Sequence, residues 1–289
     1  MSYITPKTII YDYFILISIN LFTEVIILYL KVSRENQLYI LILSSIVDNS
    51  INYLKELINT SQRIVVFTGA GISSESGIPT YRGSDGVWSK YDPAVYADIN
   101  IFLRDPTYFW QFFKEEQYPI LKKAKPNDAH YALATLQKQR KKLTVITQNI
   151  DGLHQLAGIK DVIELHGNMR TISCLQCKKT YSIDDVYHKV TKALPPLCSC
   201  RGMLKPNVVL FGEQLPEYAL AEAIRAASSC DLFVVLGSSL VVYPAASLPE
   251  IAKQQEASLV IVNIDPTALD SIADMVIRQP ISAVLPSVL

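Results

Sequence analysis

The sequence predicts an α/β protein in which helices cover both faces of a parallel β-sheet, a doubly wound fold. Short continuous apolar runs are the pattern of strands that are buried on both faces. Such runs recur at residues 64–67, 143–146, 208–211, 232–236 and 259–262. Stretches with apolar residues at helical spacing separate them, at residues 130–139, 218–227 and 245–255. Because strands alternate with helices in this way, we expect a parallel sheet with crossover helices.

The regular pattern begins with a helix that is predicted over residues 46–59. Its apolar residues at helical spacing are Ile46, Val47, Ile51, Leu54, Leu57 and Ile58. The first strand, residues 64–67, follows directly. Ligands of doubly wound proteins bind beyond the carboxyl ends of the strands, so functional motifs are expected just after the apolar runs.

The composition is that of one globular chain with a sizeable core. Of the 289 residues, 49% are hydrophobic and 19% are charged, which excludes a disordered or low-complexity protein. The formal net charge is zero, so no global basic field would attract nucleic acid or an acidic membrane. Five cysteines without a clear signal peptide argue against a secreted disulfide scaffold and favour a metal site in a reducing compartment.

Residues 14–30 are almost wholly apolar and leave three interpretations of an N-terminal extension, residues 1–45, open. These seventeen residues, with Glu24 among them, are at the short limit for a membrane anchor, in which case Lys31 and Arg34 would hold the main domain in the cytoplasm. The alternatives are a helix packed on the main domain and a start codon placed too early. Because everything downstream is complete without this stretch, we expect either a start codon placed too early or a dispensable extension, and a cytoplasmic main domain.

A Gly-x-Gly turn, formed by Gly69, Ala70 and Gly71, follows the first predicted strand. Such a turn lets the backbone approach a pyrophosphate, whose charge meets the amide groups of a helix start. Ser74 stands where a G-x-G-x-x-G motif has its third glycine, so a tight structural turn would also explain the tripeptide.

The continuation of this turn, residues 73–83, is polar and interrupted by Gly and Pro. It is too irregular for a core element and indicates a loop that folds over a bound ligand. Arg82 is able to pair with phosphate, and Tyr81 offers a ring face to a leaving base. A solvated surface loop is the alternative.

Amide and carboxylate side chains follow the second strand, where Gln148, Asn149 and Asp151 come directly after residues 143–146 and Thr147. Such groups suit the recognition of ribose hydroxyls and of a carboxamide. An Asx turn with a helix cap explains one or two of these residues but not all of them.

Of the four histidines, His166 is the candidate general base, because an imidazole has a pKa suited to proton transfer at neutral pH. It ends an apolar segment, precedes Gly167 and stands just before the cysteine cluster. Taken singly, each of the other three, His130, His154 and His188, is interpreted as structural or exposed.

Four cysteines predict a structural zinc site. Cys174 and Cys177 form a C-x-x-C pair, and Cys198 and Cys200 form a C-x-C pair twenty residues later. Two close pairs at this separation are typical of zinc, and four thiolates make a closed tetrahedral site without an open position for chemistry. Buried free cysteines or a redox pair are the alternatives. Cys230, before a buried strand, is interpreted as an ordinary core thiol.

Three further segments carry weaker signals, and each alone would pass for a loop. Residues 205–213 have the pattern of an extended backbone that pairs with a peptide strand. Two segments place small or polar residues just past a strand, where an adenosine half would bind; they are Gly237, Ser238 and Ser239, and Asn263, Ile264 and Asp265.

Taken together and in this order, the segments resemble the sirtuins, NAD-dependent protein deacylases, in their zinc-containing prokaryotic and archaeal branch. The matching stretches are GAGISSESGIPTYRG, TQNIDGLH, ELHGN, CLQC with CSC, PNVVLFGE, GSSLVVYPAA and VNID. The resemblance implies a Rossmann-like large domain and a smaller zinc-binding plus helical domain. Within a catalytic domain of residues 46–289, the helical insert would lie at about 84–128 and the zinc module at about 169–205.

The resemblance also implies a role for each motif residue. NAD would be bound by Gly69, Ala70, Gly71, Ser74, Tyr81, Arg82, Gln148, Asn149, Ile150, Asp151, His166, Gly237, Ser238, Ser239, Asn263, Ile264, Asp265 and Ile281. The acyl-lysine tunnel would be lined by Val208, Val209 and Phe211. The catalytic residues would be His166, Asn149 and Asp151, and the ligands of one zinc ion would be Cys174, Cys177, Cys198 and Cys200.

The reaction implied is the transfer of an acyl group from the lysine of a protein or peptide to NAD. The acyl oxygen attacks C1′ of the nicotinamide ribose, nicotinamide leaves, and His166 deprotonates a ribose hydroxyl that attacks the alkylimidate. The alternatives are a mono-ADP-ribosyltransferase, a non-enzymatic module that binds NAD or acyl-lysine, and, more distantly, a dehydrogenase. The intact segment 208–211 and His166 favour deacylation.

The sequence departs from the family pattern at Tyr81, where a phenylalanine is usual, in the short C-x-C pair, and in residues 1–45, which have no counterpart. Sirtuins that remove negatively charged acyl groups use a Tyr and an Arg three residues apart on the helix after the cofactor loop. Alignment of residues 110–116 places Phe113 and Glu116 there. A carboxylate in place of the cation would repel succinyl-lysine, so we expect acetyl or longer neutral acyl groups.

Overall fold

The computed structural model describes residues 14–21, 24–31, 37–82, 86–139 and 142–289, with side chains from residue 49 onward. The chain divides into two compact units, Met1–Ser50 and Ile51–Leu289. Helix α1 (Gln37–Thr60) contains the boundary between them. It begins at Gln37, earlier than the helix predicted over residues 46–59.

The first unit contains an antiparallel strand pair, β1 (Phe14–Leu21) and β2 (Glu24–Lys31). The described residues of the apolar stretch 14–30 are therefore strands, whereas the anchor and packed-helix interpretations require a helix. The stretch contains five isoleucines, whose β-branched side chains favour extended backbone. Among the described residues, no helix has the length and apolar character needed to cross a membrane. Arg34 lies outside these residues.

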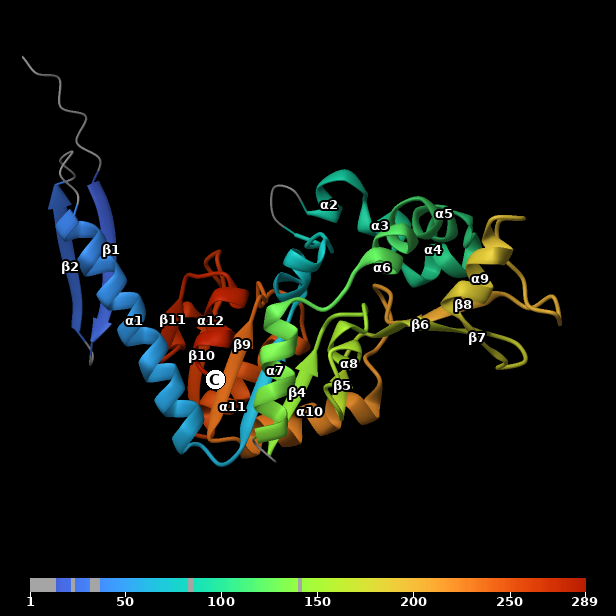
Figure 1. The fold of residues 1–289 in the computed structure, drawn as a ribbon. Helices are drawn as coiled ribbons and strands as arrows, with labels where there is room; N and C mark the ends of the chain where they lie inside the picture. The colour runs from blue at the N-terminus through green and yellow to red at the C-terminus, as the bar shows by residue number, and fades with distance from the viewer. Residues whose placement is uncertain (1–13, 22–23, 32–36, 83–85, 140–141) are drawn as a thin grey trace, which may run out of the picture. The chain divides into compact units, whose positions relative to one another are not determined.

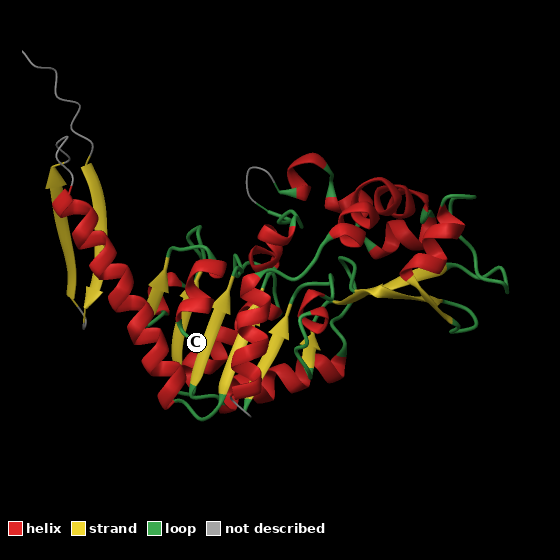
Figure 2. Cartoon of the chain, viewed as in Figure 1, coloured by secondary structure: helices red, strands yellow, loops and turns green. Residues whose placement is uncertain are grey.

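The second unit is built on a six-stranded parallel sheet with the order β11-β10-β9-β3-β4-β5 (Figure 2). The strands are β3 (Ile64–Thr68), β4 (Leu143–Thr147), β5 (Val162–Glu164), β9 (Leu232–Leu236), β10 (Ser258–Val262) and β11 (Met275–Ile277). The predicted doubly wound fold is confirmed. Strand order reverses between β3 and β9, and this switch point is where such folds bind ligands.

Helices cover both faces of the parallel sheet (Figure 1). One face packs against α7 (Asp128–Gln139), α12 (Ile281–Ser287) and Leu54 and Ile58 of α1. The other face packs against α10 (Glu217–Ser229) and α11 (Leu248–Gln254). Because alternate residues of β3 enter the two cores, its sequence is a continuous apolar run. The shorter helices around the sheet are η1 (Ala70–Ser76), α8 (Leu153–Leu156), η3 (Ala245–Ser247) and η4 (Asp270–Ile272).

A smaller part of the second unit combines an antiparallel sheet with helices. The sheet has the order β7-β6-β8 and consists of β6 (Gly167–Cys174), β7 (Thr180–Ser182) and β8 (Leu204–Val208), with α9 (Ile183–Val190) beside it. The helices are α2 (Val87–Lys90), α3 (Pro93–Tyr96), α4 (Ile99–Arg104), α5 (Thr107–Phe112), the π-helical turn η2 (Phe113–Gln117) and α6 (Tyr118–Lys123). Both groups share one core, in which Trp110 and Phe113 pack with Met169 and Ile172.

The run at residues 208–211 was expected in the parallel sheet, and that prediction is wrong. Strand β8 ends at Val208 and pairs antiparallel with β6. It is an edge strand of the sheet. Pro206, which has no amide hydrogen to donate, is therefore tolerated within it. Residues 209–211 continue beyond it as the loop that lines the cavity described below. Strands β5 and β11 escaped prediction because three residues are too short for a recognisable apolar run.

Candidate active site and zinc centre

A cavity of about 930 Å³ lies at the carboxyl edge of the parallel sheet and extends to the helical part and the segment after β8. Its lining includes nearly all of the residues that the sequence analysis proposed. They are Gly69, Ala70, Gly71, Ser74, Tyr81, Arg82, Gln148, Asn149, Ile150, His166, Val208, Val209, Phe211, Gly237, Ser238, Ser239, Asn263, Ile264, Asp265 and Ile281. Segments far apart in the sequence thus meet at one site.

Asp151 lines an adjoining cavity of about 200 Å³ instead. The two cavities share residues, among them Ala70, Tyr81, Asn149 and Ile150. The sequence analysis did not separate these two spaces, because Asn149, which lines both cavities, and Asp151, which lines only the smaller one, belong to the same short loop after β4.

The glycines after β3 and β9 allow two loops to approach closely at the switch point. The Gly71 amide donates to the Gly237 carbonyl at 2.9 Å. A Cβ on Gly71 would lie 2.6 Å from the Gly237 Cα, and Gly237 itself has φ of +65°. Packing between the loops alone therefore requires these glycines, as the structural-turn interpretation stated, and the same absence of side chains keeps the backbone open to the cavity.

Asn149 and Asp151 are held by a buried polar network that centres on Ser73. The Ser73 hydroxyl donates to Asp151 Oδ2 at 2.8 Å and accepts from Asn149 Nδ2 at 3.2 Å. Asn149 Nδ2 also donates to the Gly69 carbonyl, and the Leu153 amide donates to Asp151 Oδ1. Burial raises the pKa of Asp151, while these donated hydrogen bonds act in the opposite direction. Sequence analysis missed Ser73, because it is one of several serines in the loop.

Two buried histidines lie behind this network. His154 Nε2 is 2.8 Å from the Thr68 hydroxyl, and the His130 ring lies 5.1 Å from the His154 ring. Burial lowers the pKa of His130 to about 4 and that of His154 to about 3, so both rings are neutral at pH 7. His188 is exposed on α9. The structural or exposed interpretation of these three histidines agrees with their positions.

His166 lies at the cavity with one ring nitrogen committed to the backbone. Its Nδ1 is 2.9 Å from the Gln148 carbonyl oxygen, which can only accept, so Nδ1 carries the proton. Nε2 of the neutral ring is therefore an acceptor. Burial lowers the pKa of His166, the Arg82 cation lowers it further, and the bond to Gln148 partly offsets both effects. The neutral, proton-accepting form thus predominates at pH 7.

The segment after β8 joins the histidine to the helical part. The Val209 amide donates to the His166 carbonyl at 2.9 Å, and the Phe211 amide donates to the Ala97 carbonyl at 2.8 Å. The Phe211 carbonyl accepts from the Ile99 amide at 3.0 Å. These bonds hold residues 209–211, whose side chains are apolar, along the wall of the cavity.

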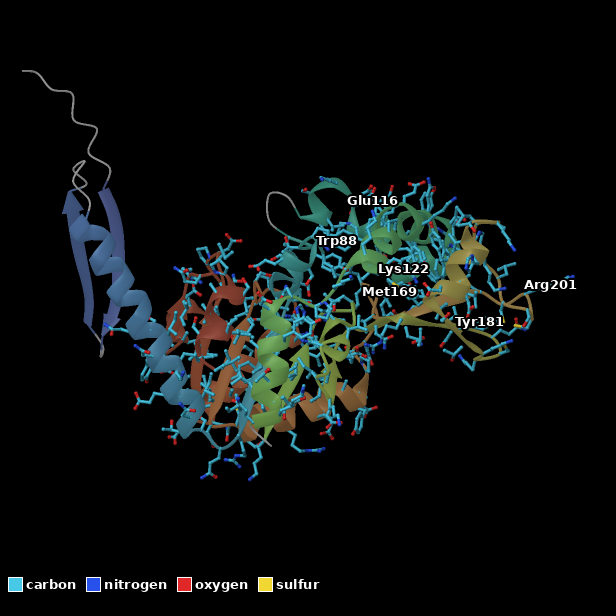
Figure 3. The ribbon with its side chains drawn as sticks, viewed as in Figure 1. Trp88, Glu116, Lys122, Met169, Tyr181 and Arg201 are labelled. Carbon is cyan, nitrogen blue, oxygen red and sulfur yellow. The ribbon has the colours of Figure 1, made fainter. Side chains whose placement is uncertain are left out.

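Several aromatic and apolar side chains in this wall were not anticipated. Trp88 on α2 packs against the Tyr81 ring at 5.3 Å and the Phe211 ring at 6.3 Å, and Met169 lies on β6 (Figure 3). Phe109 and Phe112 on α5 also line the cavity. Their spacing of three residues is helical, but only the packed structure shows which side of the helix faces the cavity.

The predicted positions of Phe113 and Glu116 beside the acyl group are wrong. Phe113 is fully buried in the core of the helical part and does not line the cavity. The Glu116 carboxylate accepts a hydrogen bond of 2.6 Å from the Tyr91 hydroxyl and faces only the smaller cavity. Alignment with the family assigned these two positions, but the residues of this helical stretch that line the large cavity are Phe109, Phe112 and Gln117. The stretch Phe113–Gln117 forms a π-helical turn.

The four predicted zinc ligands form one cluster. Their sulfur atoms lie within 4.8 Å of one another. Sγ of Cys174 is 3.5 Å from that of Cys200, and Sγ of Cys177 is 3.6 Å from that of Cys198. Zinc–sulfur bonds of about 2.3 Å place the sulfurs of a tetrahedral site about 3.8 Å apart, so these residues are positioned to bind one zinc ion.

The short C-x-C pair is accommodated by a tight turn. The Cys198 amide donates to the Gly202 carbonyl, and Arg201 has φ of +66°. A Cβ on Gly202 would lie 2.7 Å from Sγ of Cys174, so a larger residue would displace a ligand. The Tyr181 hydroxyl lies 3.0 Å from Sγ of Cys198 and lowers the pKa of that thiol to about 5, which favours the thiolate that zinc needs. Tyr181 and Arg201 are labelled in Figure 3.

Cys230 stands apart from this cluster. It is buried against the sheet, and burial raises the pKa of its thiol to about 11. Its expected role as a core thiol agrees with this position.

Comparison with known proteins supports the same assignment. The Sir2 family matches residues 69–244. An NAD-dependent protein deacetylase of Sulfurisphaera tokodaii is 49% identical over 234 residues, which cover 81% of this chain and 92% of the relative. NAD-dependent protein deacylase 2 of Archaeoglobus fulgidus is 49% identical over 243 residues, which cover 83% of this chain and 95% of the relative. A solved structure of Sir2 with a p53 peptide and NAD+ has a TM-score of 0.77 and 45% identity, with 82% of this chain and 96% of that chain covered. By sequence and by fold, the chain belongs to the Sir2 family.

Proposed function

We propose that the chain is an NAD-dependent protein-lysine deacylase that converts acyl-lysine, NAD and water to lysine, nicotinamide and O-acyl-ADP-ribose. The observation that carries this proposal is the shared cavity. It brings a glycine-rich dinucleotide loop, a neutral histidine and an apolar wall into one space. The deacetylase and deacylase relatives support the same activity.

NAD would bind across the switch point of the sheet. The loop after β3 would meet the phosphates, with Arg82 as a cation at its end. Ser238, Ser239 and Asn263, which follow β9 and β10, would contact the adenosine half. The nicotinamide ribose would lie near Gln148 and Asn149, with the nicotinamide toward Asp151 and the smaller cavity. A dinucleotide would thus extend along the whole carboxyl edge of the sheet.

His166 would act as the general base. Since Nδ1 donates to the Gln148 carbonyl, Nε2 has the free lone pair that accepts a proton from a ribose hydroxyl. The same hydrogen bond orients the ring and stabilises the positive charge that develops on it. Asn149, fixed by Ser73, would lie beside the ribose whose hydroxyl points at this nitrogen, and Asp151, fixed by the same serine, would face the nicotinamide from the smaller cavity.

The acyl-lysine side chain would pass along Val208, Val209 and Phe211. Phe109, Phe112 and Met169 also line the cavity and would surround the acyl group with apolar surface. A substrate peptide would pair with the extended backbone of this segment, as an added strand does. The zinc ion, bound by the four cysteines, would hold β6 and β8 in place and take no part in the reaction.

Incubation of the zinc-loaded protein with NAD and an acetyl-lysine peptide tests the proposal. Mass spectrometry should show deacetylated peptide, nicotinamide and O-acetyl-ADP-ribose in equal amounts. A peptide that gains ADP-ribose and retains its acetyl group would instead identify a mono-ADP-ribosyltransferase. Binding of both ligands without any product would identify a binding module.

A further inference from the structure

Lys205 precedes the cavity-lining segment after β8, Glu213 lies within that segment and itself lines the cavity, and the two side chains are joined by an ion pair. Lys205 Nζ is 2.9 Å from Glu213 Oε2. The same ammonium donates to the Val208 carbonyl at 2.8 Å and to the Pro206 carbonyl at 3.3 Å. An ammonium group has three donors, and here all three have acceptors within one loop. Glu213 Oε2 also accepts from the Leu210 amide at 2.8 Å.

The Lys205 side chain is only 11% exposed, the lowest value for any cation among these ion pairs of the described residues. A buried ion pair costs desolvation free energy that its own attraction barely repays, so stability alone is a weak reason for it. The geometric effect of the ion pair is specific. The Lys205 ammonium, at the start of the loop, binds both Glu213 near its end and the Val208 carbonyl between the two residues.

The segment closed by this pair is the wall along which the acyl-lysine would pass. Its Val209 amide bonds to the His166 carbonyl, and its Phe211 amide bonds to Ala97. These backbone bonds attach Val209 and Phe211 to neighbouring segments, while Lys205 bonds to the Val208 carbonyl of the segment itself. Loss of the ammonium would remove its hydrogen bond to the Val208 carbonyl and would leave the Glu213 carboxylate with the Leu210 amide as its remaining donor.

We propose that Lys205 and Glu213 are positioning residues that set the affinity for the acyl-lysine substrate and leave the NAD site unchanged. This inference rests on the proposed deacylase function. The side chains of the pair bond to the backbone of Pro206, Val208 and Leu210, and none of these bonds reaches the loops after β3, β9 and β10. Its removal should therefore separate the two substrates kinetically.

The test compares Lys205→Met with Lys253→Met. Lys253 forms an ion pair of the same kind with Asp274 at 2.5 Å, but neither residue lines either cavity. Initial rates are measured with an acetyl-lysine peptide varied at saturating NAD and with NAD varied at saturating peptide. Lys205→Met should raise KM for the peptide by about tenfold or more and leave KM for NAD within about twofold. Lys253→Met should change neither value.

Fluorescence polarisation of a labelled acetyl-lysine peptide, without NAD, measures peptide binding independently. It should show that Lys205→Met binds this peptide more weakly than the wild-type protein does. Glu213→Gln keeps an acceptor for the Leu210 amide, removes the charge, and should give a smaller rise in the same KM. If Lys205→Met does not fold, Glu213→Gln is the variant that tests the inference. Lys205→Arg retains the charge, but a planar guanidinium cannot direct three donors at the same acceptors, so it should behave like Lys205→Met.

An unchanged peptide KM in the folded Lys205 and Glu213 variants would overturn this inference, and so would an equal rise in both KM values. These results would leave the deacylase function standing as long as the wild-type protein releases nicotinamide and lysine. A wild-type protein that consumes no NAD with any acyl-lysine peptide would overturn the proposed function itself.

Discussion

At the scale of single residues, the hydrogen bonds around His166 decide which of its nitrogens is available. Nδ1 donates to a backbone carbonyl, and burial keeps the ring neutral at pH 7. The base is therefore in its accepting form before substrate binds. Since its pKa is lowered, the rate should be sensitive to this group only below the ordinary histidine pKa of 6.5.

The substitution His166→Ala should abolish deacetylation and leave NAD affinity within about threefold, because general base catalysis contributes about a hundredfold or more to rate and acts after NAD has bound. Steady-state rates and calorimetric titration with NAD measure the two effects. His188→Ala, on the exposed side of α9, is the control and should keep wild-type activity. Near-wild-type turnover of His166→Ala would remove this residue from the mechanism.

The buried histidines behind Asp151 should make stability depend on pH. His130 and His154 have pKa values of about 4 and about 3 in the folded protein, below the value of 6.5 expected when they are unfolded. The unfolded chain therefore binds more protons below pH 6.5, and the free energy of unfolding falls as pH decreases from there toward 4.

Denaturant unfolding at pH 7 and pH 4.5 should show a loss on the order of a few kcal/mol from these two groups. In His130→Gln the pH dependence should become shallower, even though the protein is less stable at pH 7. His188→Ala should retain the wild-type slope. A His130→Gln protein with an unchanged slope would mean that other groups cause the acid sensitivity.

At the scale of elements, the zinc centre connects strands β6 and β8 to the substrate wall. Cys174 ends β6, and the turn that carries Cys198 and Cys200 leads directly into β8 and residues 208–211. The three-stranded sheet is small, and its core is shared with the helical part. Metal binding and the geometry of the wall should therefore be coupled.

Removal of zinc with a strong chelator should lower the melting temperature and abolish activity together, since metal binding contributes to folding in a closed site. Metal analysis should find one zinc per chain in the wild-type protein and in Cys230→Ala, and less than one in Cys177→Ser. Cys177 is exposed, so its substitution disturbs packing little. Fully active protein without metal would contradict the four-thiolate site.

At the scale of the whole molecule, the cavity unites the edge of the parallel sheet with the helical part and the segment after β8. The side chains around the acyl path come from helix α5, strand β6 and the loop after β8. Phe109, Phe112, Met169 and Val208 are all apolar. Glu116 faces the smaller cavity, so it should not contribute to the choice between neutral and charged acyl groups.

Acetyl-lysine should be processed far more efficiently than succinyl-lysine in the same peptide. A succinyl carboxylate buried against this wall without a partner would cost several kcal/mol, which corresponds to a loss of about a thousandfold or more in kcat/KM. Measuring kcat/KM for both peptides decides the matter. Equal values would show that a cation reaches the acyl group, and Arg82, which lines the same cavity, would be the first to substitute.

The sequence by itself determined the doubly wound sheet. Strands that are buried on both faces must be continuously apolar, and the apolar runs of this chain are too short to be buried helices. It also determined the zinc ligands, since two close cysteine pairs need only local turns to reach one ion. The motif residues after β3, β4, β9 and β10 were found for a similar reason. Parallel strands bring their carboxyl ends to one edge, so order along the chain is enough to place them together.

The tertiary structure alone decided which side chains face the cavity from the helical part and how residues 204–213 are used. In the folded chain Phe113 is buried in the core of the helical part and Glu116 faces the smaller cavity, and alignment of the sequence did not show either position. The apolar run at residues 208–211 leaves the sheet after Val208, the last residue of β8, and the Lys205–Glu213 ion pair spans it. Both outcomes depend on contacts between residues distant in sequence or on opposite sides of a loop, and the free energy of such contacts does not appear in any local pattern.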